Sequence, residues 1–581
     1  MNILYSNIKN FLDIVNILKI IAIITVGSYL ILDIVPFFEG ANQYFYGVES
    51  IQFSKGIFVY SNEFLENSGR HEFITNNWLV TIHNTAVPIA GIGLALIGSI
   101  FFTVSGYFGL FYLTPIFAII LLITTERLGT LVSNRYVGLI ALLIVGTSNL
   151  FLRNSNQLQN DTVFASFLIL GIYFLIRFTK KDNPNFLLLA TIFFTFSSFI
   201  RINGIIIFPI EVLVLVIYFS KIRNKFFGIK SNMTKHTAKK TIKIIFFISI
   251  PWIIFISYWF VFYDYNFGDP FTNYRLLQDH DEVVRDSTIS SLFMFKDSDW
   301  QDVKQFSMYL LPYQIPGAYN SMEKSHDENI LFWPGMVSLF LLFVTTIIFI
   351  RKNKNWLFLI FLLIILSNVW FYSAITTEER AEKGVPGRYM IPVFALSSIM
   401  IGFFIFRIFF NNEKSNTKKF RKKIIKTLGI VLLTGFFSMA LVFSPISNLF
   451  DPEFVAKNPW ELSERYPLDM EGLDKNGVIV TLMGERALEY EMTPFRIAKQ
   501  SQISNDSITL LKEIIEKGNN VYVFKRPYTM AEKDLMNDFI NNYGFTLNDH
   551  SKTFCKIELS SNNKISNENC IDNPPIRKTS N

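Results

Sequence analysis

Residues 185–220 read NFLLLATIFFTFSSFIRINGIIIFPIEVLVLVIYFS. Two apolar stretches, 185–200 and 202–220, meet at one charged residue, Arg201, and the only other charge is Glu211. Each stretch approaches the roughly 20 apolar residues that an α-helix needs to cross a bilayer. A helix surrounded by lipid is apolar on all sides, so amphipathic periodicity is not expected. The stretch therefore predicts two consecutive membrane helices.

The rest of the chain has a similar composition. Of its 581 residues, 50% are hydrophobic, 61 are Phe and only 17% are charged, against roughly 25% charged residues in soluble domains. This excludes a single soluble enzyme, a disordered chain and a disulfide-rich domain. Ten further apolar runs predict membrane segments, at 20–38, 86–104, 106–125, 137–152, 161–178, 244–263, 329–350, 356–375, 389–410 and 427–445.

Positive charge is concentrated in five short connections between these runs. Segment 221–243 carries eight Lys or Arg and no acid, and segment 411–426 carries seven with one Glu. Together with 125–135, 179–185 and 351–355, they hold 22 basic and 3 acidic residues, a net +19 in a chain of total charge +7, which leaves −12 elsewhere. Short basic connections mark the cytoplasmic side of a membrane. The charge therefore predicts a multi-pass cell-membrane protein with a cytoplasmic N-terminus and an extracytoplasmic C-terminal segment, and no nucleic-acid partner.

This alternation allows only eleven crossings, so either 86–104 or 106–125 stays on one side of the membrane. Run 86–104 is rich in Gly and small residues and contains Pro88. We expect it to form a re-entrant or juxtamembrane helix on the outer side. The outer face then also holds the long loops 39–85 and 264–328.

The fold class that we predict is an α-helical polytopic membrane protein with a small C-terminal α/β domain. The membrane module covers 1–445, the extracytoplasmic α/β domain 446–560, and a polar flexible tail 561–581. Both cysteines, Cys555 and Cys570, fall in this outer region. An oxidising compartment allows a bridge between them, but the spacing leaves it open. The predicted elements are strands at 477–483, 520–525 and 553–559 and helices at 507–517 and 529–543.

Polar residues at the outer membrane boundary are the candidates for chemistry. A carboxylate accepts a proton from a hydroxyl, and arginines bind phosphate bidentately. The combination suits an anionic substrate and a hydroxyl to be activated, although either arginine alone could simply anchor a helix end at the headgroups. The candidates are Glu39, His83, Asp161, Arg201, Arg388 and Tyr389.

Short motifs follow one another along the chain in a recognisable order. They are Glu39 with Tyr44 and Tyr46, the stretch His83 to Gly91, Glu126-Arg127-Leu128-Gly129, Ser148 to Phe151, Asn160-Asp161, Ser198 to Gly204, Phe267-Gly268-Asp269-Pro270 with Tyr274, and the most specific, Gly387-Arg388-Tyr389-Met390-Ile391-Pro392. In this order they resemble the GT-C superfamily of polytopic glycosyltransferases, in its branch of dolichyl-phosphate-mannose protein mannosyltransferases (glycosyltransferase family 39) and aminoarabinose lipid A transferases.

The resemblance implies an inverting transfer of a sugar at the outer membrane face. The donor would be a polyprenyl- or dolichyl-phosphate-linked sugar, and the acceptor a hydroxyl on a protein, lipid or lipid-linked glycan. Glu39 would be the catalytic base. A single Glu stands here where the family usually has an Asp-Glu pair, so Asp33 and Glu49 are the fallback bases.

The resemblance also assigns the remaining site residues. Arg201 and Arg388, helped by Tyr389, would hold the donor phosphate, whereas His83, Asp161 and Tyr44 would belong to the acceptor side and the outer loops. We expect no metal and no other cofactor. The expected partners are the lipid-linked donor, the acceptor and membrane lipids.

Two other functions are alternative hypotheses. A transporter or lipid flippase could use Glu211, which lies mid-membrane two residues after Pro209. Transporters usually show paired repeats, and none is visible, so a hydrogen-bonded or protonated Glu211 packed inside the bundle is the simpler interpretation. A catalytically inactive assembly partner that carries the outer α/β domain is the third hypothesis.

Overall fold

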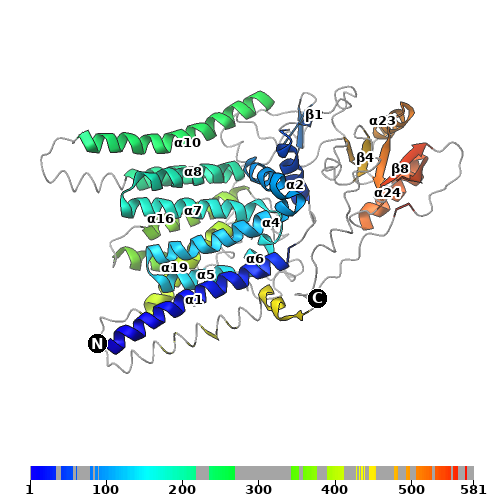
Figure 1. The fold of residues 1–581 in the computed structure, drawn as a ribbon. Coiled ribbons are helices and arrows are strands. Elements are labelled where there is room, and N and C mark those ends of the chain that lie inside the picture. Colours follow the sequence, from blue (N-terminus) through cyan, green and yellow to red (C-terminus); the bar gives the residue numbers. More distant parts are fainter. Residues whose placement is uncertain are drawn as a thin grey trace.

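The structure is a computed structural model of a helical bundle followed by a separate mixed sheet (Figure 1). The residues that it describes are 2–34, 41–56, 60–61, 79–82, 85–88, 91–216, 235–267, 342–351, 357–375, 389–410, six positions between 427 and 438, 444–452, 477–481, 493–496, 505–525, 530–550, 554–559 and 570–571.

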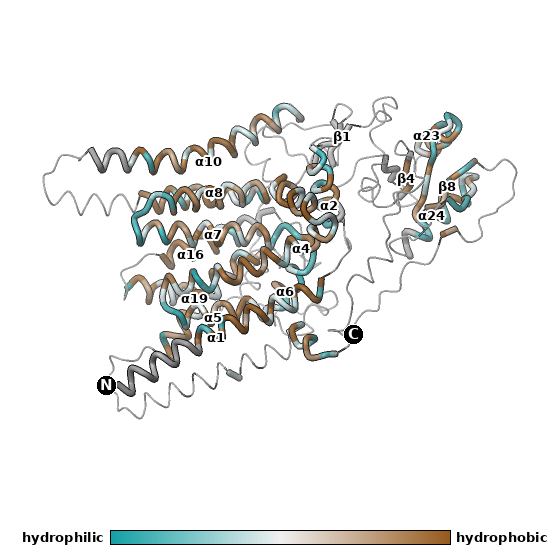
Figure 2. Tube along the Cα trace, viewed as in Figure 1, coloured by the Kyte–Doolittle hydropathy of each residue, from teal (hydrophilic) through white to brown (hydrophobic). Residues whose placement is uncertain are grey.

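The long helices of the bundle lie side by side in Figure 1, and Figure 2 shows that they are hydrophobic over most of their length. They are α1 (Asn2–Leu32), α4 (Gly93–Val132), α7 (Asn160–Lys181), α8 (Pro184–Ile200), α10 (Lys235–Phe267), α16 (Leu357–Ile375) and α19 (Ile391–Phe410). Shorter helices of the bundle are α5 (Arg135–Gly146), α6 (Asn149–Ser155), Asn203–Val216 and Leu342–Arg351, and the 3-10 turns are η2 (Ile202–Ile206) and η3 (Pro445–Phe450).

Five helices within the described residues are long and apolar enough to cross a membrane, or six if α5 and α6 count as one broken span. The predicted run 137–152 is this broken pair, bent by 67°. The bend follows from Ser148, whose side chain accepts a hydrogen bond from the Phe151 amide and so starts a new helix. The total of eleven crossings also depends on residues outside the described part, so that number stays a prediction.

The two ends of the bundle are distinguished by their polar contacts. At one end, Asp161 at the start of α7 forms an ion pair with Arg201 at the end of α8, and Arg201 lies over the ring of Tyr389 just before α19. We call this the Arg201 end. At the opposite end, which we call the Glu126 end, Glu126 of α4 forms an ion pair with Lys19 of α1.

Two of the basic connections meet at the Glu126 end. The Lys180 ammonium group donates a hydrogen bond to the Leu131 carbonyl, which joins connection 179–185 to connection 125–135. The ring of Tyr136 stacks on Phe406 near the end of α19, with centroids 5.7 Å apart. These contacts agree with the prediction that the basic connections share one side. That this side faces the cytoplasm stays a prediction.

Helix α4 consists of two helices that meet at Gly106, where the backbone has φ 60° and ψ −145°. The first, 93–105, begins with Gly93 against the backbone of Ile200 and packs on α2 (Ala41–Ser54). The second begins near the same end, because Thr114 accepts a hydrogen bond from the Gln159 amide. Both ends of the first helix therefore lie at the Arg201 end. This agrees with the prediction that run 86–104 does not cross the bundle, whereas its place at the outer membrane face stays a prediction.

Its start differs from the prediction. Residues 86–88 belong to strand β3 (Thr85–Pro88), which pairs antiparallel with β1 (Tyr60–Ser61) and β2 (Leu79–Ile82). Valine and threonine in this stretch favour a strand over a helix, and the helix begins only at Gly93.

Phenylalanine rings fill much of the bundle interior. Phe349, Phe358 and Phe403 come from three helices, and their ring centroids lie 4.0 to 5.1 Å apart. Lipid tails are as apolar as these rings, so membrane helices associate through close packing rather than through exclusion of water. The abundance of Phe in the sequence therefore serves helix association.

The C-terminal unit is a five-stranded mixed sheet in the order β5-β4-β6-β8-β7. Strand β4 is parallel to both β5 and β6, whereas β8 is antiparallel to β6 and β7. The sheet packs with its two helices around a hydrophobic cluster distinct from that of the bundle. The elements are β4 (Val478–Thr481), β5 (Thr493–Arg496), α23 (Asn505–Glu516), β6 (Val521–Phe524), α24 (Met530–Tyr543), β7 (Phe545–Asp549) and β8 (Phe554–Leu559).

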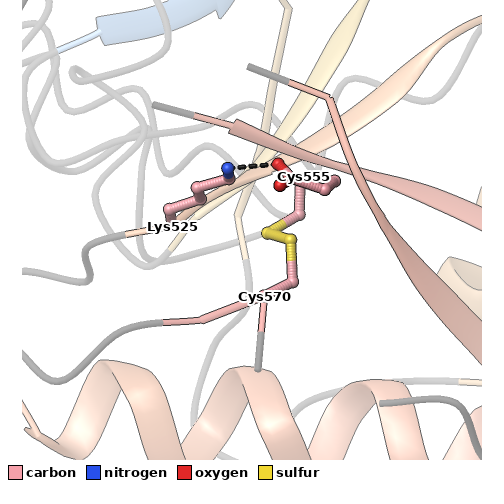
Figure 3. Close-up of a disulfide and its surroundings, with 4 residues drawn as sticks. Lys525, Cys555 and Cys570 are labelled. Atoms are coloured by element: carbon pink, nitrogen blue, oxygen red, sulfur yellow. Dashed lines mark ion pairs between the residues drawn. A yellow bond between two sulfur atoms is a disulfide. The ribbon is translucent and has the colours of Figure 1, made fainter. Parts of the chain in front are cut away.

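Strands β5 and β7 were not predicted, and the structure differs from the predicted boundaries at two places. Ile446 is buried in the cluster of the bundle, so the bundle extends past residue 445. A disulfide joins Cys570 to the buried Cys555 of β8, beside the ion pair that Lys525 forms with Asp549 (Figure 3). Ile571 is buried in the sheet's cluster. The predicted tail 561–581 is therefore anchored to the sheet at residues 570–571.

We expect the disulfide to contribute substantially to the stability of the sheet. It closes a segment with a sequence separation of 15, and a loop of that size corresponds to roughly 3 kcal/mol in the chain-entropy account. Substitution Cys570→Ser in the full chain should speed amide hydrogen exchange in β8 and β6 by about two orders of magnitude, while the amides of α7 keep their protection. Unchanged exchange in β8 would contradict this contribution.

Candidate functional site

The candidate site lies at the Arg201 end, where α8 ends. Arg201 follows the last residue of α8 with an extended backbone, and η2 begins directly after it. The Gly204 amide donates a hydrogen bond to the Arg201 carbonyl at 2.9 Å. A Cβ at Gly204 would lie 2.8 Å from the backbone N and Cα of Ser198. Glycine is therefore required for the turn that places Arg201.

The Arg201 side chain is held from two directions. Its guanidinium group forms an ion pair with the Asp161 carboxylate, and its Cζ lies 4.5 Å from the centroid of the Tyr389 ring. The Asp161 side chain is 1% exposed and the Arg201 side chain 17% exposed. Asp161 also lies in the first turn of α7, where the helix dipole favours a negative charge. Three of the predicted site residues thus meet at one point.

A second group of polar contacts joins the end of α1 to the segment before α7. The Asp33 carboxylate accepts hydrogen bonds from the Tyr29 hydroxyl at 2.5 Å and from the Asn156 amide at 2.7 Å. In α2, the Gln43 amide donates to the side-chain oxygen of Gln157 at 2.9 Å. The side-chain amides of Asn156, Gln43 and Gln157 were not predicted as site residues. The signal for them was the run of Asn and Gln between residues 154 and 160, directly before Asp161.

Several predicted site residues cannot be compared with this geometry. Glu39, His83 and Arg388 lie outside the described residues, and Tyr44 is described only as part of the backbone of α2. Within the described part of the chain, no three His, Cys, Asp or Glu side chains come close enough together to hold a metal ion. Because Glu39 and His83 fall outside that part, the expectation of no metal stays a prediction.

Glu49 of α2 is fully buried, and neither of its carboxylate oxygens has a hydrogen-bond partner. It lies within electrostatic range of the Tyr258 hydroxyl of α10. Helix α2 is not one of the helices long and apolar enough to cross the membrane. Burial raises the pKa of the Glu49 carboxyl well above its ordinary value of 4.5. A carboxyl group in this position is shielded from a substrate.

Glu211 lies in the middle of the bundle and both of its oxygens accept hydrogen bonds. The Thr191 hydroxyl donates to one at 2.5 Å and the Trp252 indole to the other at 2.9 Å. Glu211 thereby links its own helix to α8 and α10. It also borders a small apolar cavity whose other lining residues come from α7, α8, α16 and its own helix. The contacts favour a structural role for Glu211 over a transport path, so we do not propose a transporter.

Comparison with solved structures identifies the fold. ArnT from Cupriavidus metallidurans bound to undecaprenyl phosphate aligns over 94% of this chain and 97% of its own, with a TM-score of 0.50 and 11% identity. The apo state of ArnT aligns over 95% and 98%, with a TM-score of 0.50 and 10% identity. The archaeal oligosaccharyltransferase AglB from Archaeoglobus fulgidus, in complex with an inhibitory peptide and a dolichol-phosphate, covers 93% of this chain and 74% of its own, with a TM-score of 0.44 and 14% identity.

The likeness to ArnT shows that this chain has the fold of the GT-C superfamily, as the order of its motifs predicted. The fold is that of a polytopic membrane protein, in agreement with the apolar helices. The sequence matches no protein-family model and no curated protein.

A methyl group at residue 204 should disturb the turn that carries Arg201. Because the obstacle is the backbone of Ser198, Gly204→Ala should lower the free energy of unfolding by about 1–3 kcal/mol, as overpacking does. The midpoint of thermal unfolding in detergent measures this. Gly435→Ala is the control, since a Cβ at that residue meets no atom within 4 Å. Equal midpoints for the two variants would contradict the account of the turn.

The buried Glu49 should make stability depend on pH. Below pH 4.5 its carboxyl is protonated in both states, whereas above pH 4.5 the unfolded chain releases the proton and the folded protein retains it. The free energy of unfolding therefore falls as pH rises from about 4.5 towards the raised pKa of the folded state. Glu49→Gln, which stays neutral, should gain stability over the native chain as pH rises from 4.5 to 7.5. The exposed Glu516→Gln serves as the control, and an equal pH trend in both variants would show that Glu49 is ionised when folded.

Proposed function

We propose that this protein transfers a sugar from a polyprenyl-phosphate carrier to a hydroxyl-bearing acceptor, at the Arg201 end of the bundle. The observation that carries the proposal is the cluster of Asp161, Arg201 and Tyr389 at one end of a GT-C fold. A lipid-linked donor places its phosphate at the membrane boundary and its sugar outside. A cation held at the end of a membrane bundle suits that geometry.

Arg201 is the proposed ligand of the donor phosphate. A guanidinium group presents five N–H donors in a planar fork that matches phosphate oxygens. Arg388, which precedes Tyr389 in the sequence, is proposed as the second phosphate ligand. The solved structure of ArnT contains undecaprenyl phosphate and that of AglB a dolichol-phosphate, so lipid phosphates are the donor carriers to test first.

Glu39 is the proposed catalytic base. Asp33 and Gln43, on either side of it in the sequence, are hydrogen-bonded to Asn156 and Gln157, which directly precede α7. Glu39 is four residues from Gln43, and n residues of extended chain span at most about 3.6 Å × n, so Glu39 is confined to about 14 Å from that anchor. Of the fallback bases, Asp33 is engaged by the Tyr29 hydroxyl, and Glu49 is fully buried. Glu39 is therefore preferred over both.

The proposed reaction is a single displacement with inversion. The Glu39 carboxylate takes the proton of the acceptor hydroxyl, and the acceptor oxygen forms a bond to the anomeric carbon of the sugar. The bond from that carbon to the phosphate oxygen breaks, and polyprenyl phosphate leaves with the electron pair. The Arg201 guanidinium stabilises the charge that develops on the leaving phosphate.

The sidedness follows from the charge pattern. The basic connections at the Glu126 end are proposed to face the cytoplasm, in accordance with the positive-inside rule. The Arg201 end, the donor sugar and the C-terminal sheet are then extracytoplasmic.

Removal of the base should abolish transfer without unfolding the protein. In lipid nanodiscs with undecaprenyl-phosphate-linked sugars, Glu39→Gln should reduce the release of undecaprenyl phosphate by about 10²- to 10⁴-fold, the usual contribution of a general base. Glu49→Gln is the matched control and should retain most of the activity.

Asp33→Asn tests the alternative that Asp33 is the catalytic base instead of Glu39. A loss in Asp33→Asn equal to that in Glu39→Gln would leave the identity of the base between the two residues. Full activity in Glu39→Gln, Asp33→Asn and Glu49→Gln alike would refute the proposed chemistry. Absence of transfer from every donor by the native chain would favour the inactive assembly partner.

A further inference from the structure

Asp161 is the residue whose surroundings differ most from its expected role. The sequence placed it on the acceptor side, yet its carboxylate is 1% exposed and forms an ion pair with Arg201. A carboxylate buried against a guanidinium group is not available to bind an acceptor hydroxyl. Its direct effect is on the arginine.

The Arg201 guanidinium group has two neighbours that restrict its orientation. The Asp161 carboxylate forms an ion pair with Nη1 of Arg201, and the ring of Tyr389, just before α19, lies 4.5 Å from Cζ. Holding an arginine side chain in one position costs rotamer freedom. Here the protein meets that cost during folding rather than when the substrate binds.

Asp161 cannot aid phosphate binding through its charge. Paired with Arg201, it cancels most of the positive charge that attracts a phosphate group, because the attraction between charges falls when an opposite charge lies beside one of them. A site that relied on charge alone would bind phosphate more tightly without this aspartate. Any benefit from Asp161 must therefore come from the orientation of Arg201.

We infer that Asp161 is a positioning residue for the donor phosphate: it orients the Arg201 guanidinium group against Tyr389 so that the fork of N–H donors meets the phosphate of a polyprenyl-phosphate donor. This inference rests on the proposed function. A carboxylate can accept two of the five guanidinium donors at once, which leaves the fork able to serve a second oxyanion. Asp161 itself touches neither substrate.

Binding of undecaprenyl phosphate to the native chain in nanodiscs tests the inference without turnover. Asp161→Asn should weaken this binding roughly tenfold, since a small misplacement of a positioning group has effects of that order or larger. Asp161→Glu, which keeps the charge, should recover part of the affinity. Asp182→Asn at the opposite end of the same helix is the control and should bind as the native chain does. It removes an exposed carboxylate at a left-handed backbone position that Asn tolerates.

A double-variant cycle shows whether Asp161 acts through Arg201. In an Arg201→Gln background, Asp161→Asn should cause no further loss of affinity, because the side chain through which it is proposed to act is already absent. The double variant also removes the buried carboxylate that has lost its ion-pair partner Arg201. Further weakening in that background would overturn the inference.

The kinetic constants separate the inference from its alternatives. Asp161→Asn should raise KM for the lipid donor and leave KM for the acceptor unchanged. A change confined to the acceptor KM, or unchanged or tighter lipid binding, would overturn the positioning role. If the native chain binds undecaprenyl phosphate but transfers no sugar, the proposed function fails while the role of Asp161 stands. If the native chain does not bind the lipid, both fail.

Discussion

The ion pair between Asp161 and Arg201 is the contact on which the candidate site depends. It joins the first turn of α7 to the end of α8, and through Tyr389 it reaches the start of α19. Two charges removed from water are costly unless they are well paired. At the boundary of a membrane bundle, where polar side chains must find partners within the protein, this pair satisfies both charges at once. It also explains why three sequence segments spread over more than 200 residues meet at one point.

The Arg201 end and the Glu126 end use polar residues in different ways. At the Glu126 end, Lys19 and Glu126 form a buried ion pair that holds α1 on α4, and Thr130 donates a further hydrogen bond to Glu126. At the Arg201 end, the ion pair of Asp161 and Arg201 lies against Tyr389, which directly follows Arg388 in the sequence. The ion pair at the Glu126 end holds two helices together. The ion pair at the Arg201 end lies where we expect the donor phosphate to bind.

The sequence predicted the bundle well because membrane helices are long and uniformly apolar, and because the basic connections constrain which runs can cross. It also predicted that Asp161 and Arg201 share one face. The ion pair between them was harder to predict from the sequence, because it requires α7 and α8 to form an antiparallel hairpin in one register. The contacts of Asn156 and Gln157 with the N-terminal segment could not be inferred, because they depend on how α1 packs. Strand β5 was missed because it is only four residues long and contains Pro494.

The disulfide between Cys555 and Cys570 has a consequence for how the chain reaches its final topology. Such a bond forms and persists only where the surroundings are oxidising. A chain inserted in the opposite orientation would leave the same sheet in a reducing compartment, with residues 570–571 released from it. The redox state of one cysteine pair in the C-terminal unit therefore reports the orientation of every helix in the membrane.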